Sequence, residues 1–474
     1  MATKSLQIFI WGTTLLVVMN LIQAGTTELL DDESYYWMYS QHLDWGYYDH
    51  PPMIAWMIRA GYMLFPGTLG IRLFSVLAIG ACFWILYVLQ KPWNPIQMLI
   101  LIFSAGIIHF GGFLAVPDVP LVFFSAVFLL LYRWFLREET WTNSLLLGVC
   151  MAALVYSKYQ AILLVGICLA TNIKLLKSKK FWTALLVCFV LMIPHIYWQW
   201  SHGLPSFQYF LNERYSSSTY HLWYTTDYIF GQLFFLGPLI GWLIFLAAFT
   251  QKPHGDHWIL TLKSIVCGVL IFFLLSSFKG HVEPNWTAII IIPSLLLLHY
   301  YLGHKPRMEK VLYRMFPISL ALILLIRIGL VWNLAGDKIA INKELHSNKD
   351  WTSVIKMKAR GFPVYFINSY QQASKYIYYQ HGLATSYNGD GYRNNQYDFW
   401  RPETKWFQDS ILVVSVERSH VSNDSICFPQ GKLYFKMFLN PNVFVNYSFY
   451  LHMPKRKLLV PFLGEKLFAH KGTR

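Results

Sequence analysis

Charged residues are scarce in this chain. Only 13% of its 474 residues are Asp, Glu, Lys or Arg, whereas soluble domains contain about 25%. Hydrophobic residues make up 55% of the chain and aromatic residues 18%, and the mean hydropathy is +0.38. This composition excludes a disordered chain, a collagen, a coiled coil and a small disulfide scaffold. An integral membrane protein is the class that remains.

Acidic residues and cysteines are also few. The 24 acids are outnumbered by 39 Lys and Arg, which gives a net charge of +15. In a soluble protein this excess would suggest nucleic acid, but in a membrane protein basic loop residues set the topology, so we expect no nucleic-acid partner. The six cysteines show no Cys-x-x-Cys or other ligand spacing. That argues against a disulfide framework and a cysteine zinc site.

Long apolar runs predict an α-helical polytopic membrane protein. A helix that crosses a bilayer needs about 20 apolar residues. The first run lacks an Ala-x-Ala cleavage site, so we interpret it as a span rather than a signal peptide. The sequence predicts about 11 transmembrane helices (11–13), at residues 6–24, 68–89, 96–114, 119–136, 144–157, 159–173, 181–200, 227–250, 259–277, 286–302 and 311–333.

The distribution of charge divides the chain into two domains. Residues 1–333 contain 20 basic and 14 acidic residues, and the much shorter segment 334–474 contains 19 and 10. We therefore expect a transmembrane domain followed by a C-terminal soluble domain. In the second segment, residues 362–368 and 410–416 have the pattern of buried strands, and residues 371–380 that of a helix. Strand, helix and strand predict a small α/β domain.

The basic residues orient the spans. With the N-terminus inside, the short inner segments carry eleven basic residues and the outer loops carry four, as the preference for positive charge on the cytoplasmic side requires. An odd number of spans then places the C-terminal domain outside. The long first outer loop, residues 25–67, contains an apolar segment at 54–65 that is too short to span. It is either an interfacial amphipathic helix or a loop packed on the bundle.

This first outer loop concentrates acidic residues. Six of the 14 acids before residue 334 fall between residues 28 and 49. Asp31, Asp32 and Glu33 follow the first span, where mutual repulsion near a low-dielectric boundary raises a pKa. Such a carboxylate can act as a general base or a metal ligand. A solvated cap on a helix is the alternative.

Aromatic residues are interleaved with these acids. Tyr35 and Tyr36 follow Glu33, and Asp49-His-Pro-Pro52 ends a second aromatic stretch. Rings that stack on sugar faces beside acids that accept from hydroxyls suit carbohydrate binding, whereas an aromatic belt at the interface is the alternative. The prolines fix the backbone, and His50 can carry positive charge or donate to a phosphate.

Further candidates fall in later outer loops. Asp118, between two prolines, is an ionisable residue at a span end and thus a functional candidate. A helix N-cap for the fourth span is the alternative, and it is compatible with a functional role. Lys158, Lys279, His281 and Asn285 also lie on the predicted outer side. Cations there run against the positive-inside bias, and a phosphate held at the membrane surface would explain them. Snorkelling lysines are the alternative.

These segments together resemble the family 39 glycosyltransferases, enzymes of GT-C fold that are similar to protein O-mannosyltransferases and the aminoarabinose transferase of lipid A. Residues 394–400 are also similar to a segment of the soluble domain in bacterial members. The resemblance covers most of the chain, and its first-loop motif lacks the Arg or His that some branches carry at Tyr35. The motifs are Asp32-Glu-Ser-Tyr-Tyr36, Trp45-Gly-Tyr-Tyr-Asp-His-Pro-Pro52, Val116-Pro-Asp-Val-Pro120, Ser157-Lys158 and Lys279-Gly-His-Val-Glu-Pro-Asn-Trp286.

The resemblance implies a reaction and a location. A sugar would move, with inversion, from a polyprenyl-phosphate donor to an acceptor outside the cytoplasm, which is lipid A or another glycolipid, a polysaccharide or a protein. The expected location is the bacterial inner membrane, with the active site and the C-terminal domain on the periplasmic side. The expected partners are the lipid-linked sugar, its acceptor and the bilayer.

The resemblance also implies roles for individual residues. Asp32 matches the catalytic base and Asp118 a second catalytic acid. The expected donor-phosphate ligands are His50, Lys158, Lys279 and His281. The expected substrate-binding residues are Glu33, Tyr35, Tyr36, Asp49 and Asn285. The sequence requires no cofactor; a divalent metal stays open, because Asp49, His50, His281 and Glu283 have no diagnostic spacing.

Two other classes compete with an enzyme. A membrane transporter or flippase of lipid-linked sugars predicts paired broken helices, midspan charges and pseudo-repeated halves. A structural subunit of an envelope complex would leave the acids near Asp32 and Asp118 without a function. The predicted charges gather at one membrane face, which favours the enzyme.

Overall fold

A computed structural model describes residues 2–90, 92–209, 219–334, 344–388, 392–400, 411–415, 425–428 and 431–438. The chain forms two compact units, Met1–Asn348 and Lys349–Arg474. Each unit is described by itself below.

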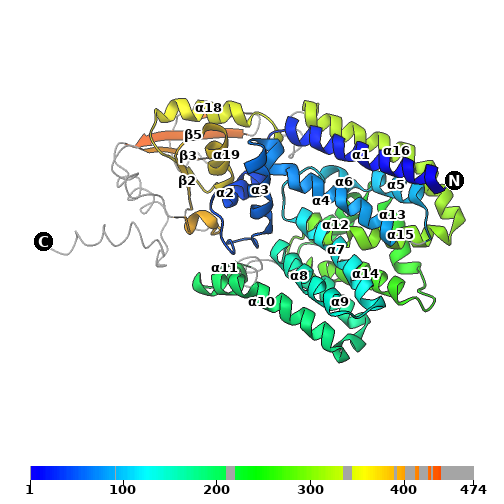
Figure 1. Ribbon diagram of the computed structural model, residues 1–474. Coiled ribbons are helices and arrows are strands. Elements are labelled where there is room, and N and C mark those ends of the chain that lie inside the picture. Colours follow the sequence, from blue (N-terminus) through cyan, green and yellow to red (C-terminus); the bar gives the residue numbers. More distant parts are fainter. Residues whose placement is uncertain are drawn as a thin grey trace. The chain divides into compact units, whose positions relative to one another are not determined.

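The described part of the first unit is helical (Figure 1). Its apolar core is built from residues of most of these helices. The elements are α1 (Ala2–Thr26), α2 (Asp31–Gln41), α3 (Met53–Leu64), α4 (Thr68–Leu89), α5 (Pro95–Ser104), α6 (Gly106–Phe110), α7 (Asp118–Arg137), α8 (Trp141–Ser157), α9 (Ala161–Thr171), η1 (Ile173–Lys177), α10 (Lys179–Ser201), α11 (Pro205–Gln208), α12 (Leu222–Leu236), α13 (Gly241–Thr250), α14 (His257–Ser276), η3 (Pro284–Ile290), α15 (Ile291–Gly303) and α16 (Pro306–Trp332).

Several of these helices are long and apolar enough to cross a membrane. Among the described residues seven pass by length and composition, and an eighth is counted if α12 and α13, bent by 104°, form one span. Counted by length and composition, these helices are therefore fewer than the eleven predicted spans. The reason is local: the segments expected at 96–114, 144–157 and 159–173 are helical, but none of their helices in the described ranges is longer than 17 residues.

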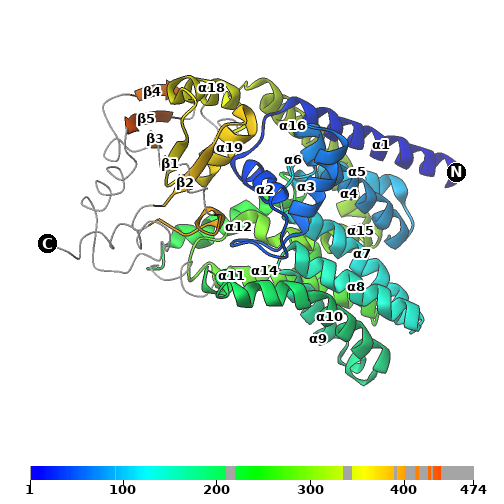
Figure 2. The same ribbon diagram turned by 60° about the vertical axis from the view of Figure 1, so that its left-hand side comes forward.

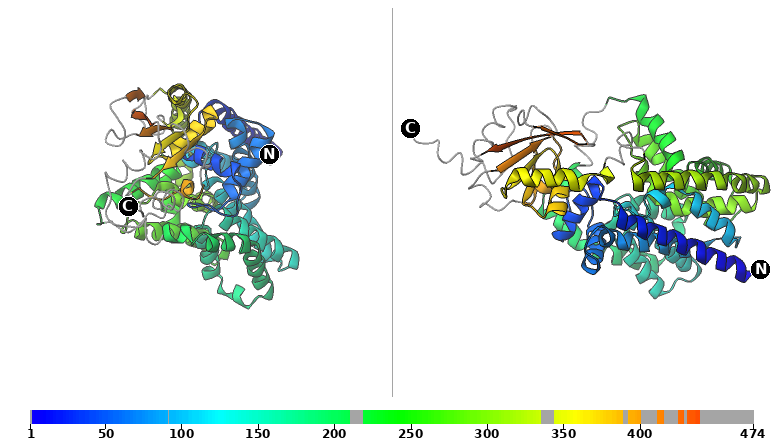
Figure 3. Two further views of the ribbon diagram at one scale, coloured as in Figure 1. Left: turned by 90° about the vertical axis from the view of Figure 1, so that its left-hand side faces the viewer. Right: turned by 90° about the horizontal axis from the view of Figure 1, so that it is seen from above.

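The first outer loop contains the helix α3, packed on the bundle. Ile54, Ala55 and Ile58 are buried. Gly61 lets α3 approach α4 closely, since a Cβ atom there would lie 2.1 Å from the carbonyl oxygen of Gly70. Figures 1 and 2 show α2, α3 and α11 at one end of the helical unit, and Figures 1 and 3 show the start of α1 at the opposite end. The end formed by α2, α3 and α11 is called the α2 end below.

The second unit contains a five-stranded mixed sheet of order β2-β1-β3-β5-β4 (Figure 2). Strands β1 and β3 and the helix α19 lie within one residue of the predicted strands and helix or inside them. β1 runs parallel to β2 and β3, whereas β5 is antiparallel to β3 and β4. The elements are α18 (Asn348–Ala359), β1 (Val364–Ile367), α19 (Tyr370–Gln380), β2 (Ala384–Tyr387), η5 (Gln396–Asp398), β3 (Ile411–Ser415), β4 (Ser425–Phe428) and β5 (Gly431–Phe438).

The two α-helices in the described part of this unit pack on one face of β1. The ring of Phe366 contacts Trp351 of α18, with centroids 6.2 Å apart, and Tyr376 of α19 at 5.8 Å. The opposite face of β1 carries Tyr365, which joins Val413 of β3 in a separate apolar cluster.

Candidate active site

The acidic motif at the start of α2 is anchored by a buried ion pair. Glu33 and Arg72 of α4 are both completely buried, and the Nη2 atom of Arg72 lies 2.5 Å from Oε2 of Glu33. Arg72 Nε also donates to Oε1 at 2.8 Å, so the contact is bidentate. The remaining donors of Arg72 reach the carbonyl oxygens of Ala24, Thr27 and Glu28. The guanidinium thus ties the end of α1 to the start of α2.

Glu33 also connects the two acidic motifs. Its Oε1 accepts from the amide of Ala115 at 2.7 Å, and its Oε2 accepts from the amide of Leu30 at 3.0 Å. Ala115 lies three residues before Asp118. The protein encloses the carboxylate of Glu33 in this structure, and the expectation that Glu33 contacts substrate stays a prediction. Through these two amides Glu33 connects the loop before α2 to the loop before α7.

Three predicted site residues from distant parts of the chain contact one another: Lys158 and Asn285 both bind the carboxylate of Asp118. Lys158, directly after α8, places its Nζ atom 2.7 Å from Oδ1 of Asp118, and the exposed fractions of the two side chains are 7% and 8%. Asn285 of η3 donates to Oδ2 at 3.0 Å. Asp118 is the first residue of α7, where a negative charge also complements the helix dipole. Its carboxylate is thus held on both oxygens by residues that the sequence had placed at the same membrane face.

A second group of predicted residues lies along α2. Asp32 is exposed at the first turn, and Tyr36 is four residues later, on the same side of the helix. The hydroxyl of Tyr36 lies 3.1 Å from Nε2 of His50. Tyr35, expected to contact substrate, is 1% exposed and packs on Tyr36 and Tyr39. The role of Tyr35 in substrate binding stays a prediction.

The carboxylate of Asp49 lies in this aromatic cluster. Asp49 is 6% exposed. Burial, together with the proximity of Tyr35 and the charge of Asp49, raises the pKa of Tyr39 well above its ordinary value. Tyr39 therefore stays protonated. Its ring also stacks on Tyr47, with centroids 4.0 Å apart.

The remaining predicted cations belong to the loop between α14 and η3. Lys279 is exposed. Nδ1 of His281 lies 3.2 Å from a carboxylate oxygen of Glu283, and its Nε2 lies 4.0 Å from Asp227 of α12. This loop is fixed to the Asp118 cluster, because Asn285 follows Glu283 by two residues. The loop that carries Lys279 and His281 is thus connected to the start of α7 through Asn285.

Sequence reasoning missed the residues that hold the loop after α2. Trp198 of α10 donates from Nε1 to Asp44 at 2.7 Å. His195, one turn earlier, bonds the carbonyl oxygen of Trp45 at 2.7 Å and the hydroxyl of Tyr159 at 3.0 Å. Arg72 was missed as well, although a lone arginine within the apolar run 68–89 was a visible signal.

Metal ligation was left open by the sequence. Within the described ranges, no three His, Cys, Asp or Glu side chains come together in a group that could hold a metal ion. Of the four candidates, His281 and Glu283 form a close pair. His50 contacts Tyr36 instead.

The fold and these motifs define a class, the multi-pass membrane proteins with the fold of GT-C glycosyltransferases. Residues 49–198 match the family described as dolichyl-phosphate-mannose-protein mannosyltransferase. The match includes His50, Asp118 and Lys158 but excludes Asp32 and the Lys279 loop. The expected resemblance to this class of glycosyltransferases is confirmed.

Individual relatives agree with this class. The chain is 24% identical over 322 residues to the lipid A galacturonosyltransferase RgtD of Rhizobium johnstonii, covering 64% of this chain and 67% of the relative. The structure is similar to apo ArnT of Cupriavidus metallidurans, with a TM-score of 0.67, 14% identity and coverage of 91% and 97%. It also resembles the archaeal oligosaccharyltransferase AglB of Archaeoglobus fulgidus, with a TM-score of 0.50, 11% identity and coverage of 86% and 70%.

Proposed function

We propose that this protein is an integral-membrane glycosyltransferase that moves a sugar from a polyprenyl-phosphate donor to an extracytoplasmic acceptor, with inversion. The acceptor is a glycolipid such as lipid A, a polysaccharide or a protein. Two of the similar structures support a lipid-phosphate donor: ArnT of Cupriavidus metallidurans bound to undecaprenyl phosphate, with a TM-score of 0.65 and 13% identity, and AglB in complex with a dolichol-phosphate.

The meeting of Asp118, Lys158 and Asn285 is the observation that carries this proposal. A carboxylate, an ammonium and an amide converge at 2.7 and 3.0 Å from three separate segments, at helix ends rather than in midspan. A buried ion pair of this kind needs additional hydrogen bonds to offset its desolvation. A purely structural subunit has no need of such a cluster beside an exposed acidic motif.

The geometry favours Asp32 as the catalytic base. Both oxygens of Asp118 accept hydrogen bonds from Lys158 and Asn285, and Glu33 is enclosed. Asp32 lies beside Glu33 but is exposed. In the proposed reaction, Asp32 takes the proton of the acceptor nucleophile as it attacks the anomeric carbon. The bond from that carbon to the phosphate oxygen breaks, and the lipid phosphate leaves with the electron pair.

The leaving phosphate needs positive charge, which His50, Lys279 and His281 supply in this proposal. Lys158 is also expected to contact the phosphate. Its ammonium lies 2.7 Å from Asp118, so in this proposal it shares its charge between the phosphate and that acid. Asp118 then acts by positioning Lys158 and Asn285. No nucleotide-binding loop is needed, because the donor contains no nucleotide.

The proposed enzyme spans the bacterial inner membrane eleven times, with the α2 end and the second unit on the periplasmic side. A cysteine at the exposed position of Leu43 or Met357 should react with an impermeant reagent in intact spheroplasts. A cysteine at Trp141, which is exposed at the start of α8, should react only after permeabilisation. The reverse pattern would contradict the orientation.

The reaction is tested by in-vitro transfer from synthetic polyprenyl-phosphate sugars with purified protein. A positioned general base contributes about 10²–10⁴-fold in rate. Asp32→Asn should therefore lower turnover by about that factor while donor binding persists. Asp31→Asn is the matched control, because it changes the neighbouring acid and should retain activity. Near-normal turnover of Asp32→Asn together with a loss in Asp31→Asn would move the base by one position.

A transporter or flippase of lipid-linked sugars is the second candidate. The 104° bend between α12 and α13 favours it, because transporters use broken helices. Reconstituted vesicles separate the two functions. A flippase moves the lipid-linked sugar across the bilayer without breaking the glycosyl bond, whereas the proposed enzyme releases polyprenyl phosphate.

A further inference from the structure

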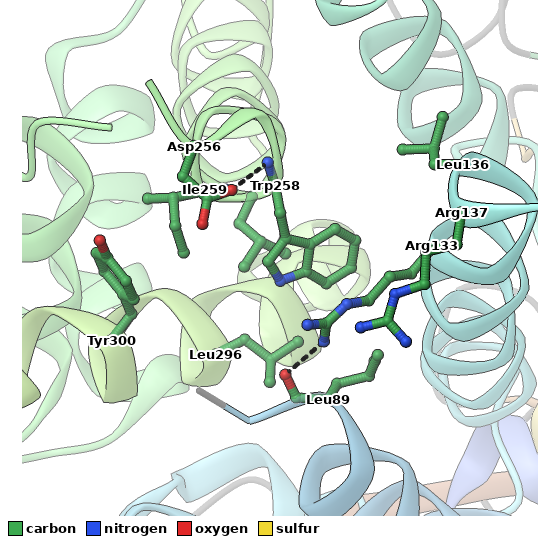
Figure 4. Close-up of a pocket in the computed structure, with 10 residues that line it drawn as sticks. Leu89, Arg133, Leu136, Arg137, Asp256, Trp258, Ile259, Leu296 and Tyr300 are labelled. Carbon is green, nitrogen blue, oxygen red and sulfur yellow. Dashed lines mark hydrogen bonds between the residues drawn. The ribbon is translucent and has the colours of Figure 1, made fainter. Parts of the chain in front are cut away.

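A cavity of about 280 Å³ lies at the opposite end of the helical unit from Asp118. It is lined by Leu89 at the end of α4, by Arg133 and Arg137 near the end of α7, and by Trp258 at the start of α14 (Figure 4). With a rise of 1.5 Å per residue, Arg133 is about 22 Å along α7 from Asp118. This cavity is separate from the candidate active site.

Two arginines give the cavity a positive wall. Figure 4 shows the guanidinium groups of Arg133 and Arg137 next to one another. Arg133 is fixed in place: its Nη1 donates to the carbonyl oxygen of Leu89 at 2.9 Å, and its guanidinium lies 5.1 Å from the ring centroid of Trp258. Among the described residues, neither arginine forms an ion pair within 4.0 Å. Two adjacent cations therefore face a cavity without a carboxylate bound to either.

The acid that lines this cavity, Asp256, caps a helix and acts on Arg133 through its charge without forming an ion pair within 4.0 Å. Oδ1 of Asp256 caps α14 by accepting from the amides of Trp258 and Ile259, at 2.8 and 3.4 Å. One acid against two arginines leaves the lining with a net positive charge. An anion that accepts from both guanidinium groups would relieve their mutual repulsion.

The rest of the lining is apolar and continues onto the exposed surface of the helices. Leu136 lines the cavity and is 38% exposed, and Trp134 on the same helix is 42% exposed. Trp258 and Tyr300, also in the lining, are the amphipathic aromatics typical of the membrane interface. The cavity has room for a headgroup, and hydrocarbon chains would lie outside it along this apolar surface. This combination fits an amphipathic anion better than a soluble one.

We infer that this cavity binds an anionic phospholipid of the bilayer, with its phosphate between Arg133 and Arg137. Basic pockets between transmembrane helices on the cytoplasmic side bind anionic headgroups in this way. The site is independent of the proposed sugar transfer, because it lies at the other end of the helices. The lipid fixes the ends of α4, α7, α14 and α15 relative to one another.

The test is native mass spectrometry of the delipidated full-length protein titrated with phosphatidylglycerol. We expect binding at least tenfold tighter than that of phosphatidylcholine, and at least a tenfold loss in Arg137→Gln. The side chain of Arg137 is exposed, and no side-chain hydrogen bond of Arg137 is found within the described ranges. This variant should therefore fold even if Arg133→Gln, which loses the contact to Leu89, does not. Arg307→Gln, an exposed arginine at the start of α16, is the matched control and should bind normally.

Three results would overturn the inference. Equal binding of phosphatidylcholine would show that the charge is not recognised. Competition by millimolar inorganic phosphate would identify a site for a soluble anion rather than a lipid. Equal losses in Arg137→Gln and Arg307→Gln would indicate general attraction to the basic end of the protein.

Discussion

The buried pair of Glu33 and Arg72 allows a quantitative test of how the acidic motif is held. Arg72→Met removes the guanidinium but retains an apolar chain of similar length. The carboxylate of Glu33 is then left with the amides of Leu30 and Ala115 as hydrogen-bond donors. Glu33→Gln makes the converse change, because it preserves shape but leaves the charge of Arg72 buried.

Both single variants should be strongly destabilised. The two side chains are fully buried, so solvent does not screen the interaction. Removing one partner of a buried ion pair costs about 3–5 kcal/mol, because the other charge stays uncompensated. The double variant Glu33→Gln with Arg72→Met removes both charges, so its loss should be smaller than the sum of the single losses. For groups in direct contact, the coupling amounts to about 0.5–3 kcal/mol, and we expect the upper part of this range.

Equilibrium unfolding in mixed detergent micelles measures all four proteins of this cycle. Arg314→Met, at an exposed position of α16, is the matched control and should change the free energy of unfolding by less than about 0.5 kcal/mol. If the double variant lost the sum of the two single values, Glu33 and Arg72 would act independently. The inference that the two side chains together hold the acidic motif would then fail.

Other predictions concern the candidate site. Lys279→Ala should weaken donor binding by a factor of about ten or more in a lipid-binding titration, because a charge-assisted contact contributes about 1.5–3 kcal/mol. An unchanged affinity would show that Lys279 does not bind the donor phosphate. Asp118→Asn should lower both stability and turnover more than Asn285→Ala does, since only Asp118→Asn leaves Lys158 buried without its counter-charge. Equal effects of the two variants in unfolding and transfer assays would contradict the proposed role of the Asp118–Lys158 pair. Tyr36→Phe should reduce donor affinity about two- to tenfold through its lost bond to His50, and an unchanged binding isotherm would show that this bond has no role.

Much of the architecture follows from local sequence properties. The scarcity of charge and the length of the apolar runs predict a helical membrane protein, and the span predicted at 68–89 is the helix Thr68–Leu89. The loop chemistry of the candidate site was also visible, because Asp118, Lys158 and Asn285 stood out as polar residues at the ends of apolar runs. These signals depend only on the local sequence, so they can be recognised without knowledge of the fold.

The tertiary structure decided which of these residues contact one another. The sequence suggested that Glu33 faces substrate and Lys158 faces phosphate, but their buried partners are Arg72, 39 residues away, and Asp118, 40 residues away. Some of the predicted spans are also short helices or a bent pair of helices in the structure. The sequence determines where the charges lie along the chain. Only packing selects the pairs, because a charge removed from water requires whichever opposite charge the fold brings within reach.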